Sequence, residues 1–429
     1  MPSGPNDPTP ADRRPVRLIV GDDLNRRRLT VFFRLLMALP HLLWLALWSI
    51  AALFAAIANW IAALFQGSSQ EPLHGFLARF VRYATHVYAY ISLAAEPFPR
   101  FGGQPDYPVD LEIDPPARQN RWTIFFRLVL AIPALLLLSI LTNSNFEESE
   151  AGFATGAGLL SIAAFFGWFY ALARGEMARG LRDAVAWVIS YGAQTWAYLL
   201  ILTDRYPSID PLTAIGPLPL RDDPVQLDAA GDDLRRSRLT VFFRLPLAIP
   251  HLVWLTLWGI AVFFAVIANW FATLFTATSP QGLHRFISAY LRYQLHVMAY
   301  LYLVGNPFPG FVGKPGSYPV ELRIAERARQ NRWTVFFRLL LAIPAFLLAG
   351  AYGSMVAVVA LFGWFVSLFT GRMPEGLRNA GAQALRYMSQ THSYLVLVTG
   401  AYPYSGPCLA PTQAPPPPAA VVPPRADAR

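Results

Sequence analysis

One seven-residue motif occurs four times along this chain. "RLTVFFR" begins at residue 28 and is repeated unchanged from residue 238, while "RWTIFFR" and "RWTVFFR" begin at residues 121 and 332. The first and third copies are followed by "PHLLWLALW" and "PHLVWLTLW", and the second and fourth by "PALLLL" and "PAFLLA". Repetition at this spacing indicates tandem copies of one supersecondary unit. We therefore predict four units in the order A, B, A′, B′.

All four units have the same internal order. A short alternating segment after a proline predicts a strand, as in "PVRLIV", "YPVDLEI", "DPVQLDA" and "YPVELRI". The motif and a long apolar run follow, and then a third segment with a helical polar stripe. The predicted boundaries are a disordered leader (1–14), unit A (15–104), unit B (105–207), a linker (208–223), unit A′ (224–315), unit B′ (316–404) and a proline-rich disordered tail (405–429).

Composition indicates a membrane protein. The 429 residues are 55% hydrophobic and 14% charged, whereas soluble domains contain roughly 25% charged residues. Residues 153–173 and 354–370 contain hardly any charge. A membrane-spanning helix needs about 20 apolar residues, and these runs approach that length.

The apolar run of unit A covers residues 29–66 and as one helix would reach about 57 Å. Since the hydrocarbon core is only about 30 Å thick, we expect two spans joined by a turn. The acidic stretch at 142–152 and the glycines at 349–354 mark that turn in units B and B′. The predicted fold is an all-α integral membrane protein with about eight spans and a small β element from the short strands.

The third segment leaves two arrangements open. Arg285, Ser288, Arg292 and His296 form one helical stripe, typical of an amphipathic helix in the membrane interface. With this helix flat, all four arginine-rich entries share one side, as the positive-inside rule favours, and the termini are cytosolic. If the third helix crosses the membrane, the chain has twelve spans and the stripe faces the bundle interior.

With its order of strand, arginine motif, apolar run and helix ending in "DRYP", the chain resembles the bacterial family known as domain of unknown function 4389. The resemblance covers four consecutive units. It implies a multi-pass protein of the bacterial cytoplasmic membrane, and it brings no established activity or catalytic residues.

The arginines of the motif are candidates for anchoring in lipid headgroups, because long basic side chains reach from apolar helices towards phosphates. We expect anionic membrane lipids as partners of this set. Its members are Arg28, Arg34, Arg121, Arg127, Arg238, Arg244, Arg332 and Arg338. Polar residues within the apolar runs of the A units are candidates for lining a cavity, namely His41, His251, Asn59 and Asn269.

The sequence favours no catalytic chemistry. It has no nucleotide-binding loop and no paired histidines, and the single cysteine, Cys408, excludes an intramolecular disulfide. We expect no enzyme activity, no cofactor, no metal and no nucleic acid partner. The favoured function is a scaffold or accessory subunit that binds a protein partner through the proline-rich tail or the cytosolic strands. The alternative is a transporter, channel or lipid-handling protein with its site between repeats.

Overall fold

The computed structural model describes residues 14–143, 157–216, 218–229 and 231–408. Unit A and unit B form the first half of the molecule. Its elements are β1 (Val16–Val20), α1 (Arg28–Gln66), α2 (Glu71–Ile91), β2 (Val109–Ile113), α3 (Arg121–Phe125), α4 (Arg127–Thr142), α5 (Leu159–Arg174) and α6 (Arg179–Leu199).

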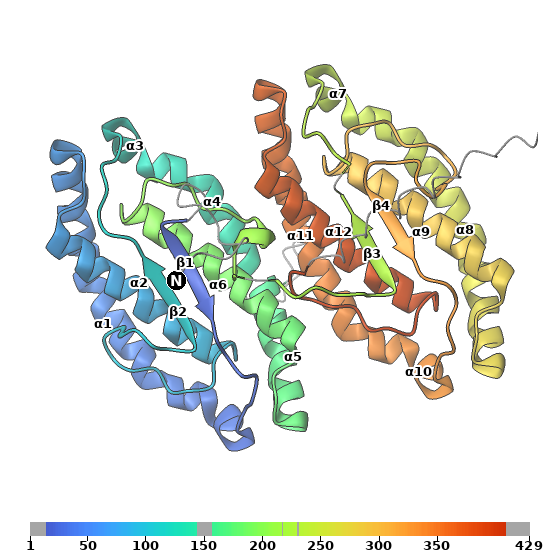
Figure 1. The fold of residues 1–429 in the computed structure, drawn as a ribbon, viewed down its shortest axis with the longest axis horizontal. Coiled ribbons are helices and arrows are strands. Elements are labelled where there is room, and N and C mark those ends of the chain that lie inside the picture. The colour runs from blue at the N-terminus through green and yellow to red at the C-terminus, as the bar shows by residue number, and fades with distance from the viewer. Residues whose placement is uncertain (1–13, 144–156, 217, 230, 409–429) are drawn as a thin grey trace, which may run out of the picture.

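Unit A′ and unit B′ form the second half in the same order (Figure 1). A short 3-10 helix, η1 (Pro211–Thr213), lies between the halves. The elements that follow it are β3 (Val225–Asp228), α7 (Arg238–Phe242), α8 (Arg244–Thr276), α9 (Gln281–Leu301), β4 (Glu321–Ile324), α10 (Arg332–Phe336), α11 (Arg338–Thr370) and α12 (Glu375–Leu395).

The predicted strands pair within each half and not across all four units. β1 is antiparallel to β2, with Val16 opposite Ile113, and β3 is antiparallel to β4, with Val225 opposite Ile324. Alternation places Val16 and Leu18 in the core while Arg17 points away from it. Each half therefore has its own two-stranded sheet.

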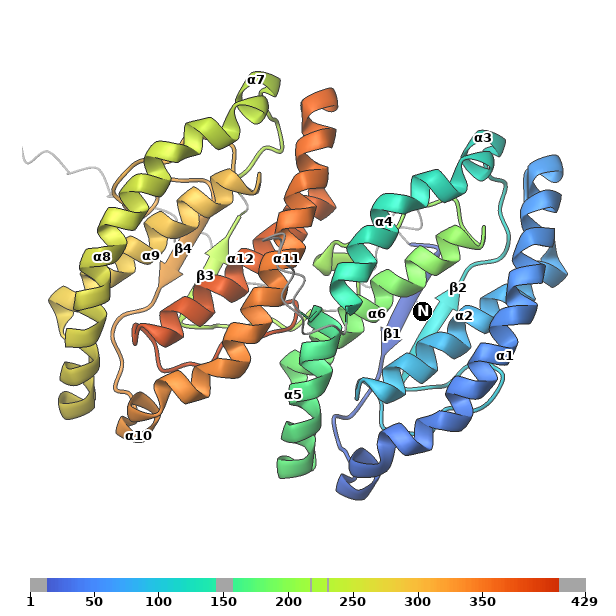
Figure 2. The same cartoon turned by 180° about the vertical axis from the view of Figure 1, so that it is seen from behind.

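The elements form three layers. Each sheet packs on the third helices, α2 and α6 in the first half and α9 and α12 in the second. The third helices pack in turn on the long helices α1, α4, α5, α8 and α11. The sheets lie at the front of Figure 1, and the long helices lie at the front of the opposite view in Figure 2. The third helices are thus the central layer of the molecule.

The predicted transmembrane hairpins are wrong for three units. α1 is one continuous helix of 39 residues, and α8 and α11 have 33 residues each. The expected turn at 349–354 lies inside α11, because Ala349, Ala351 and Tyr352 are buried against the rest of the protein. Such packing compensates for the low helix propensity of Gly350 and Gly353. The turn expected in unit B falls largely on residues 144–156, outside the described residues.

In the part of the chain that the structure describes, three helices, α1, α8 and α11, are long and apolar enough to cross a membrane. Large hydrophobic side chains are exposed along these helices and along α4 and α5. Leu47 and Phe54 on α1 are 62% and 67% exposed, and Leu257 and Phe263 on α8 are 55% and 62% exposed. We call this surface the outer apolar layer.

The two halves are joined by α11, which packs against α4 and α5, and by the segment after α12. Tyr404 donates its hydroxyl proton to Asp183 Oδ2 at 2.6 Å, and the Tyr352 hydroxyl donates to the carbonyl oxygen of Ser405. The predicted disordered tail therefore begins too early, because Ser405 and its neighbours lie buried between the halves. The predicted linker also packs there, with Asp210 accepting from Asn379.

Candidate functional site

We call the first arginine of each motif the outer arginine and the last one the inner arginine. The inner arginine binds the C-terminal end of the third helix of its own unit. Arg34 is 1% exposed and donates through Nη1 to the carbonyl oxygens of Tyr90 at 2.5 Å and Ala95 at 2.9 Å. Its guanidinium carbon lies 4.4 Å from the centre of the Tyr90 ring. A cation at the carbonyl end of a helix is favoured by the helix dipole. The other inner arginines repeat this arrangement over Tyr198, Tyr300 and Tyr394.

The predicted lipid anchoring by Arg34, Arg127, Arg244 and Arg338 is corrected by this burial. Their side chains are directed into the protein, where carbonyl groups and a tyrosine ring take the place of headgroups. The outer arginines Arg28, Arg121, Arg238 and Arg332 are exposed, and for them headgroup anchoring stays a prediction. Arg28 also donates to the carbonyl oxygen of Ala173, close to the end of α5.

The fourth residue of each motif is a valine or isoleucine, and its carbonyl oxygen accepts a hydrogen bond from a tryptophan of the other unit in the same half. Trp168 at the end of α5 donates through Nε1 to the carbonyl oxygen of Val31 at 3.0 Å, and Trp60 of α1 donates to that of Ile124 at 3.0 Å. Trp270 and Trp364 repeat the pair in the second half. Unit A and unit B therefore contact each other reciprocally, so the motif is an interunit junction.

His41 and His251 lie in aromatic boxes and not in an open cavity. His41 is fully buried, and its Nδ1 shares a hydrogen bond of 2.6 Å with the Tyr83 hydroxyl. Its ring stacks on Phe101 and is tilted against Phe98 at centroid distances of 4.4 Å and 4.3 Å. The box around His251 is equivalent, with a hydrogen bond of 2.8 Å to Tyr293.

Asn59 and Asn269 also have fixed protein partners. Asn59 donates through Nδ2 to the carbonyl oxygen of Leu200 at 3.1 Å and accepts from the Ser69 hydroxyl at 2.7 Å. Asn269 makes the same contacts with Val396 and Ser279. These asparagines connect a long helix to the end of the third helix in the neighbouring unit. The structure therefore gives them a packing role and does not place them, or the two histidines, around a shared cavity.

The B units build the same junction from a glycine and a methionine, which the sequence reading missed. Gly167 and Gly363 replace the asparagines, and Met177 and Met373 replace the serines. A Cβ atom on Gly167 would lie 2.5 Å from Met177 Cε, so the methionine fills the space of the missing side chain. Aligning "ANW" with the "GW" of "FFGW" and "LFGW" is the signal that could have revealed this exchange.

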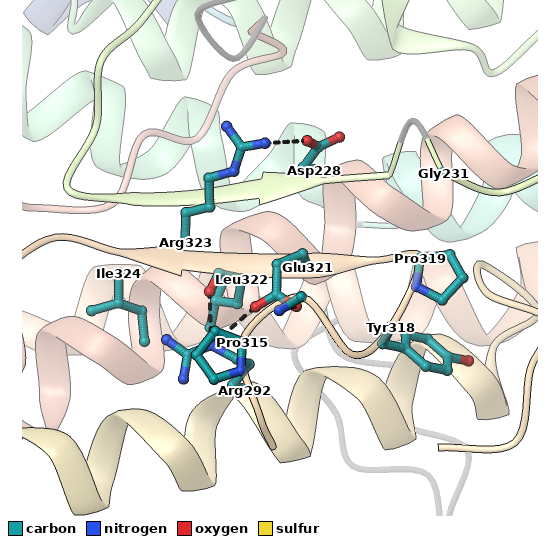
Figure 3. Close-up of a pocket in the computed structure, with 11 residues that line it drawn as sticks. Asp228, Gly231, Arg292, Pro315, Tyr318, Pro319, Glu321, Leu322, Arg323 and Ile324 are labelled. Carbon is teal, nitrogen blue, oxygen red and sulfur yellow. Dashed lines mark hydrogen bonds and ion pairs between the residues drawn. The ribbon is translucent and has the colours of Figure 1, made fainter. Parts of the chain in front are cut away.

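A cavity of about 690 Å³ lies on the polar face beside β3 and β4 (Figure 3). Glu321 forms an ion pair with Arg292, with 3.0 Å between Oε1 and Nε, and it accepts from the Gly316 N–H at 3.0 Å, while Arg323 pairs with Asp228 at 2.6 Å. The ionic groups here are matched with one another. This arrangement suits a solvated surface better than a reaction centre, which would leave a group free for substrate.

The corresponding acid of the first half is Asp110, which lies 2.8 Å from His86 Nε2. Burial alone would raise the pKa of Asp110, but hydrogen bonds from His86 and the Leu111 N–H outweigh it and the pKa falls below its usual value. Burial lowers the pKa of His74, against the opposing effect of its hydrogen bond to Leu202. Within the described ranges, no group of three or more His, Cys, Asp or Glu residues could hold a metal ion.

A second cavity, of about 480 Å³, lies at the start of α7 and is lined by Arg235, Arg236, Ser237, Asn306, Gly371 and Arg372. Neither described cavity is lined by the histidines or asparagines predicted from the sequence.

Comparison with known proteins agrees with the repeats. Residues 28–102, 154–209, 238–312 and 332–405 each match the family described as Domain of unknown function (DUF4389). The chain belongs to the DUF4389 family. The four matched segments contain α1, α5, α8 and α11 and all four third helices, whereas α3, α4 and the four strands lie outside them. No curated protein and no solved structure matches the chain.

Proposed function

We propose that this DUF4389 protein is a non-enzymatic membrane scaffold, held in the bilayer by its outer apolar layer and exposing its two sheets to the aqueous phase. The observation that carries the proposal is the separation of the two surfaces. The long helices expose large apolar side chains, whereas the sheets on the other side of the third helices carry ion pairs.

The size of the apolar surface supports membrane embedding. A soluble monomer seldom exposes contiguous apolar patches above a few hundred Å². Here exposed leucine, isoleucine and phenylalanine side chains continue along α1 and α8 from the first turn to the last. Covering this surface with lipid acyl chains is favourable, because it removes apolar side chains from water.

The continuous helices favour an in-plane arrangement over eight separate spans. α1 has 39 residues and would extend about 58 Å if straight, about twice the thickness of the hydrocarbon core. In Figures 1 and 2 the long helices run within the broad plane of the molecule, parallel to the sheet layer. We therefore propose that the outer apolar layer lies within one leaflet, with the multi-pass arrangement as the alternative outcome of the test below.

The scaffold role is supported by how the polar groups inside the molecule are used. His41, His251, Asn59 and Asn269 are held by fixed hydrogen bonds, and residues 404–405 join the halves. A transporter of repeated units moves its repeats against each other around a central site. An interface fastened by Tyr404 and Ser405 opposes such movement, and the solvated strands offer a surface for a protein partner.

Cysteine labelling in intact cells tests the membrane arrangement. In a Cys408→Ser background, Gln104→Cys and Glu326→Cys report on the sheet side and Glu148→Cys reports on the acidic stretch. An impermeant maleimide added from outside should label none of the three, and all three should react after lysis. Labelling of Glu148→Cys alone from outside would establish a crossing. Full extraction of the protein without detergent would overturn the proposal.

Distance measurement tests the rigidity that a scaffold requires. Spin labels at Gln104→Cys and Glu326→Cys report on the separation of the halves in lipid vesicles. We expect one narrow distance distribution. Two populations that exchange with a change of solute would contradict the scaffold and favour transport.

A further inference from the structure

The two A-type units differ sharply at one corner of the fold. The corner lies where the chain enters the arginine motif and forms an isolated β-bridge with the end of the B-type long helix. In the first half the bridge joins Asn25 to Glu176, and in the second half it joins Arg235 to Arg372. We call these the first corner and the second corner.

Four equivalent positions reverse the charge of the corner. The first corner has Asn25, Arg27, Glu96 and Glu176 where the second corner has Arg235, Ser237, Asn306 and Arg372. The first set carries one positive and two negative charges, and the second set carries two positive charges and no negative one. The two corners share the same backbone, so the difference lies in their side chains.

Glu96 is the centre of the first corner. Its carboxylate accepts from the Arg27 N–H at 3.0 Å and from Arg34 Nη2 at 2.6 Å, and it lies 4.0 Å from Arg26 Nε. This carboxylate, whose side chain is 18% exposed, thus accepts two hydrogen bonds and also forms an ion pair with Arg26. Charge-assisted hydrogen bonds of this kind are among the strongest in proteins.

The second corner keeps the donors and lacks the acid. Asn306 stands where Glu96 would be, and its Oδ1 lies 3.5 Å from Arg244 Nη2. Arg236 is 3% exposed, and its Nε has no hydrogen-bond partner among the described residues. Its two terminal nitrogens are held by Asp232 at 3.0 Å and 2.7 Å, so Nε is the donor left over.

Two further arginines, Arg235 and Arg372, lie opposite each other in the β-bridge beside Arg236. Like charges directly opposite each other across a β-pair are destabilising. Of the two nearby acids, Asp232 is bound to Arg236, and Asp233 accepts from the backbone N–H of Arg235 at 3.0 Å. No ion pair is formed by Arg235 or Arg372 with any described carboxylate. The cavity of about 480 Å³ opens at this point and is lined by both arginines, Arg236, Ser237 and Asn306.

We propose that the second corner binds a phosphate group, whose oxygens take the position that the Glu96 carboxylate holds in the first corner. Guanidinium groups match phosphate oxygens in bidentate geometry. The cavity exceeds what a carboxylate needs and accommodates a tetrahedral anion. The Arg235 and Arg372 side chains and the Ser237 hydroxyl, which belong to residues lining the cavity, are its donors.

The phosphate could belong to a lipid headgroup or be free in solution. Leu239 and Phe308, each two residues from a lining residue, are 71% and 50% exposed, so apolar surface adjoins the cavity. This favours an anionic phospholipid. The lipid source rests on the proposed membrane role, whereas binding of a phosphate group does not.

The decisive variant is Asn306→Glu, which supplies the missing carboxylate from within the chain. It should occupy the site and leave the protein at least as stable as the wild type, as Glu96 does in the first half. Gln104→Glu adds the same charge at an exposed position and is the matched control. If Asn306→Glu does not fold, Arg235→Asn with Arg372→Glu restores the first-corner residues at the bridge.

Binding is measured on the full chain in neutral detergent by calorimetric titration at constant ionic strength. The probes are sodium phosphate, against chloride, and short-chain phosphatidylglycerol, against phosphatidylcholine. We expect wild type and Gln104→Glu to bind, and Asn306→Glu to bind at least tenfold more weakly. Binding of phosphatidylglycerol alone assigns a lipid source, and binding of sodium phosphate assigns a site open to the free ion. Both results support the proposal.

The proposal is overturned if wild type binds neither probe, if Asn306→Glu binds like wild type, or if Gln104→Glu weakens binding equally. Its failure is separable from failure of the membrane role. Loss of membrane association in the labelling experiment would leave sodium phosphate binding intact, and absence of phosphate binding would leave the labelling pattern unchanged.

Discussion

The A-type units (A and A′) and the B-type units (B and B′) fill equivalent positions of the fold with different side chains. Where a long helix meets the neighbouring third helix, the A units use an asparagine and a serine, and the B units use a glycine and a methionine. Six of the seven histidines lie in the A units. The backbone is common to both types, so this fold specifies the volume at each junction more strictly than its polarity. The B units are the apolar version of the A units.

The inner arginines of units A and B should show the largest difference. Arg34 has a carboxylate partner in Glu96, whereas Arg127 donates to the neutral Gln119 at 2.5 Å. Arg34→Met should cost about 3–5 kcal/mol of unfolding free energy, because it leaves the partly buried Glu96 carboxylate without its partner. Arg127→Met should cost about 1–3 kcal/mol, the penalty for unsatisfied neutral groups. Equilibrium unfolding in detergent measures both, and equal losses would contradict the comparison.

Replacing the glycine and methionine of a B unit with the asparagine and serine of an A unit tests whether the fold requires only a given side-chain volume at this junction. Gly167→Asn alone should destabilise by about 1–3 kcal/mol, because the new side chain meets Met177. Gly167→Asn combined with Met177→Ser reproduces the pair of the A units and should recover most of the loss. Thermal unfolding of wild type, single and double variants decides the matter. A double variant as unstable as the single one would show that polarity is also specified.

Acid should destabilise the A units before unit B, which contains no histidine, whereas unit B′ has His392 with a pKa that burial lowers. Burial lowers the pKa of His74 and His284 in the folded protein, so the unfolded chain takes up protons first as the pH falls. The stability that the neutral histidines contribute is present above their unfolded pKa of about 6.5 and is lost below it. The B units have Arg182 and Arg378 at these positions. His74→Gln with His284→Gln should flatten the fall in melting temperature between pH 7 and pH 5.

The smallest expected effect concerns the sheet surface. Arg17 of β1 pairs with Glu112 at 2.8 Å and with Asp114 at 3.2 Å, and its side chain is 23% exposed. Among the described residues Arg323 of β4 pairs with Asp228, and both side chains are more than a third exposed. Arg323→Gln should change the unfolding free energy by less than about 1 kcal/mol, and Arg17→Gln by slightly more. A larger loss at Arg323 would indicate that the β3–β4 surface is covered by another group.

Much of the fold could be predicted from the sequence, because it depends on local patterns repeated four times. The strands, the order of elements and the polar stripe of the third helices follow from alternation and helical spacing. The hairpins were wrong because length alone cannot distinguish two spans from one long helix in the plane of the molecule. Glycines at 350 and 353 are turn signals only where packing does not hold the helix.

The site was harder to predict, because its contacts join distant segments. Arg34 lies near the start of an apolar run and resembles a lipid anchor, but its acceptor Tyr90 lies 56 residues further along the chain. The same holds for Asn59 and Leu200, which lie 141 residues apart. Glu96 and Asn306 occur in "EPFP" and "NPFP", a difference that gains meaning only once Arg34 and Arg244 are known to face them.

The contacts of Tyr404 and Ser405 have a consequence for biosynthesis. These residues are among the last of the described chain to leave the ribosome, and they bind Asp183 and Tyr352, which are made earlier. During synthesis the surface of α4 and α5 in the first half therefore stays uncovered until α11 of the second half has been made. Nascent chains with exposed apolar surface are prone to misassembly. A stop codon placed before codon 404 would remove these two contacts and leave the packing of α11 on α4 and α5 to join the halves.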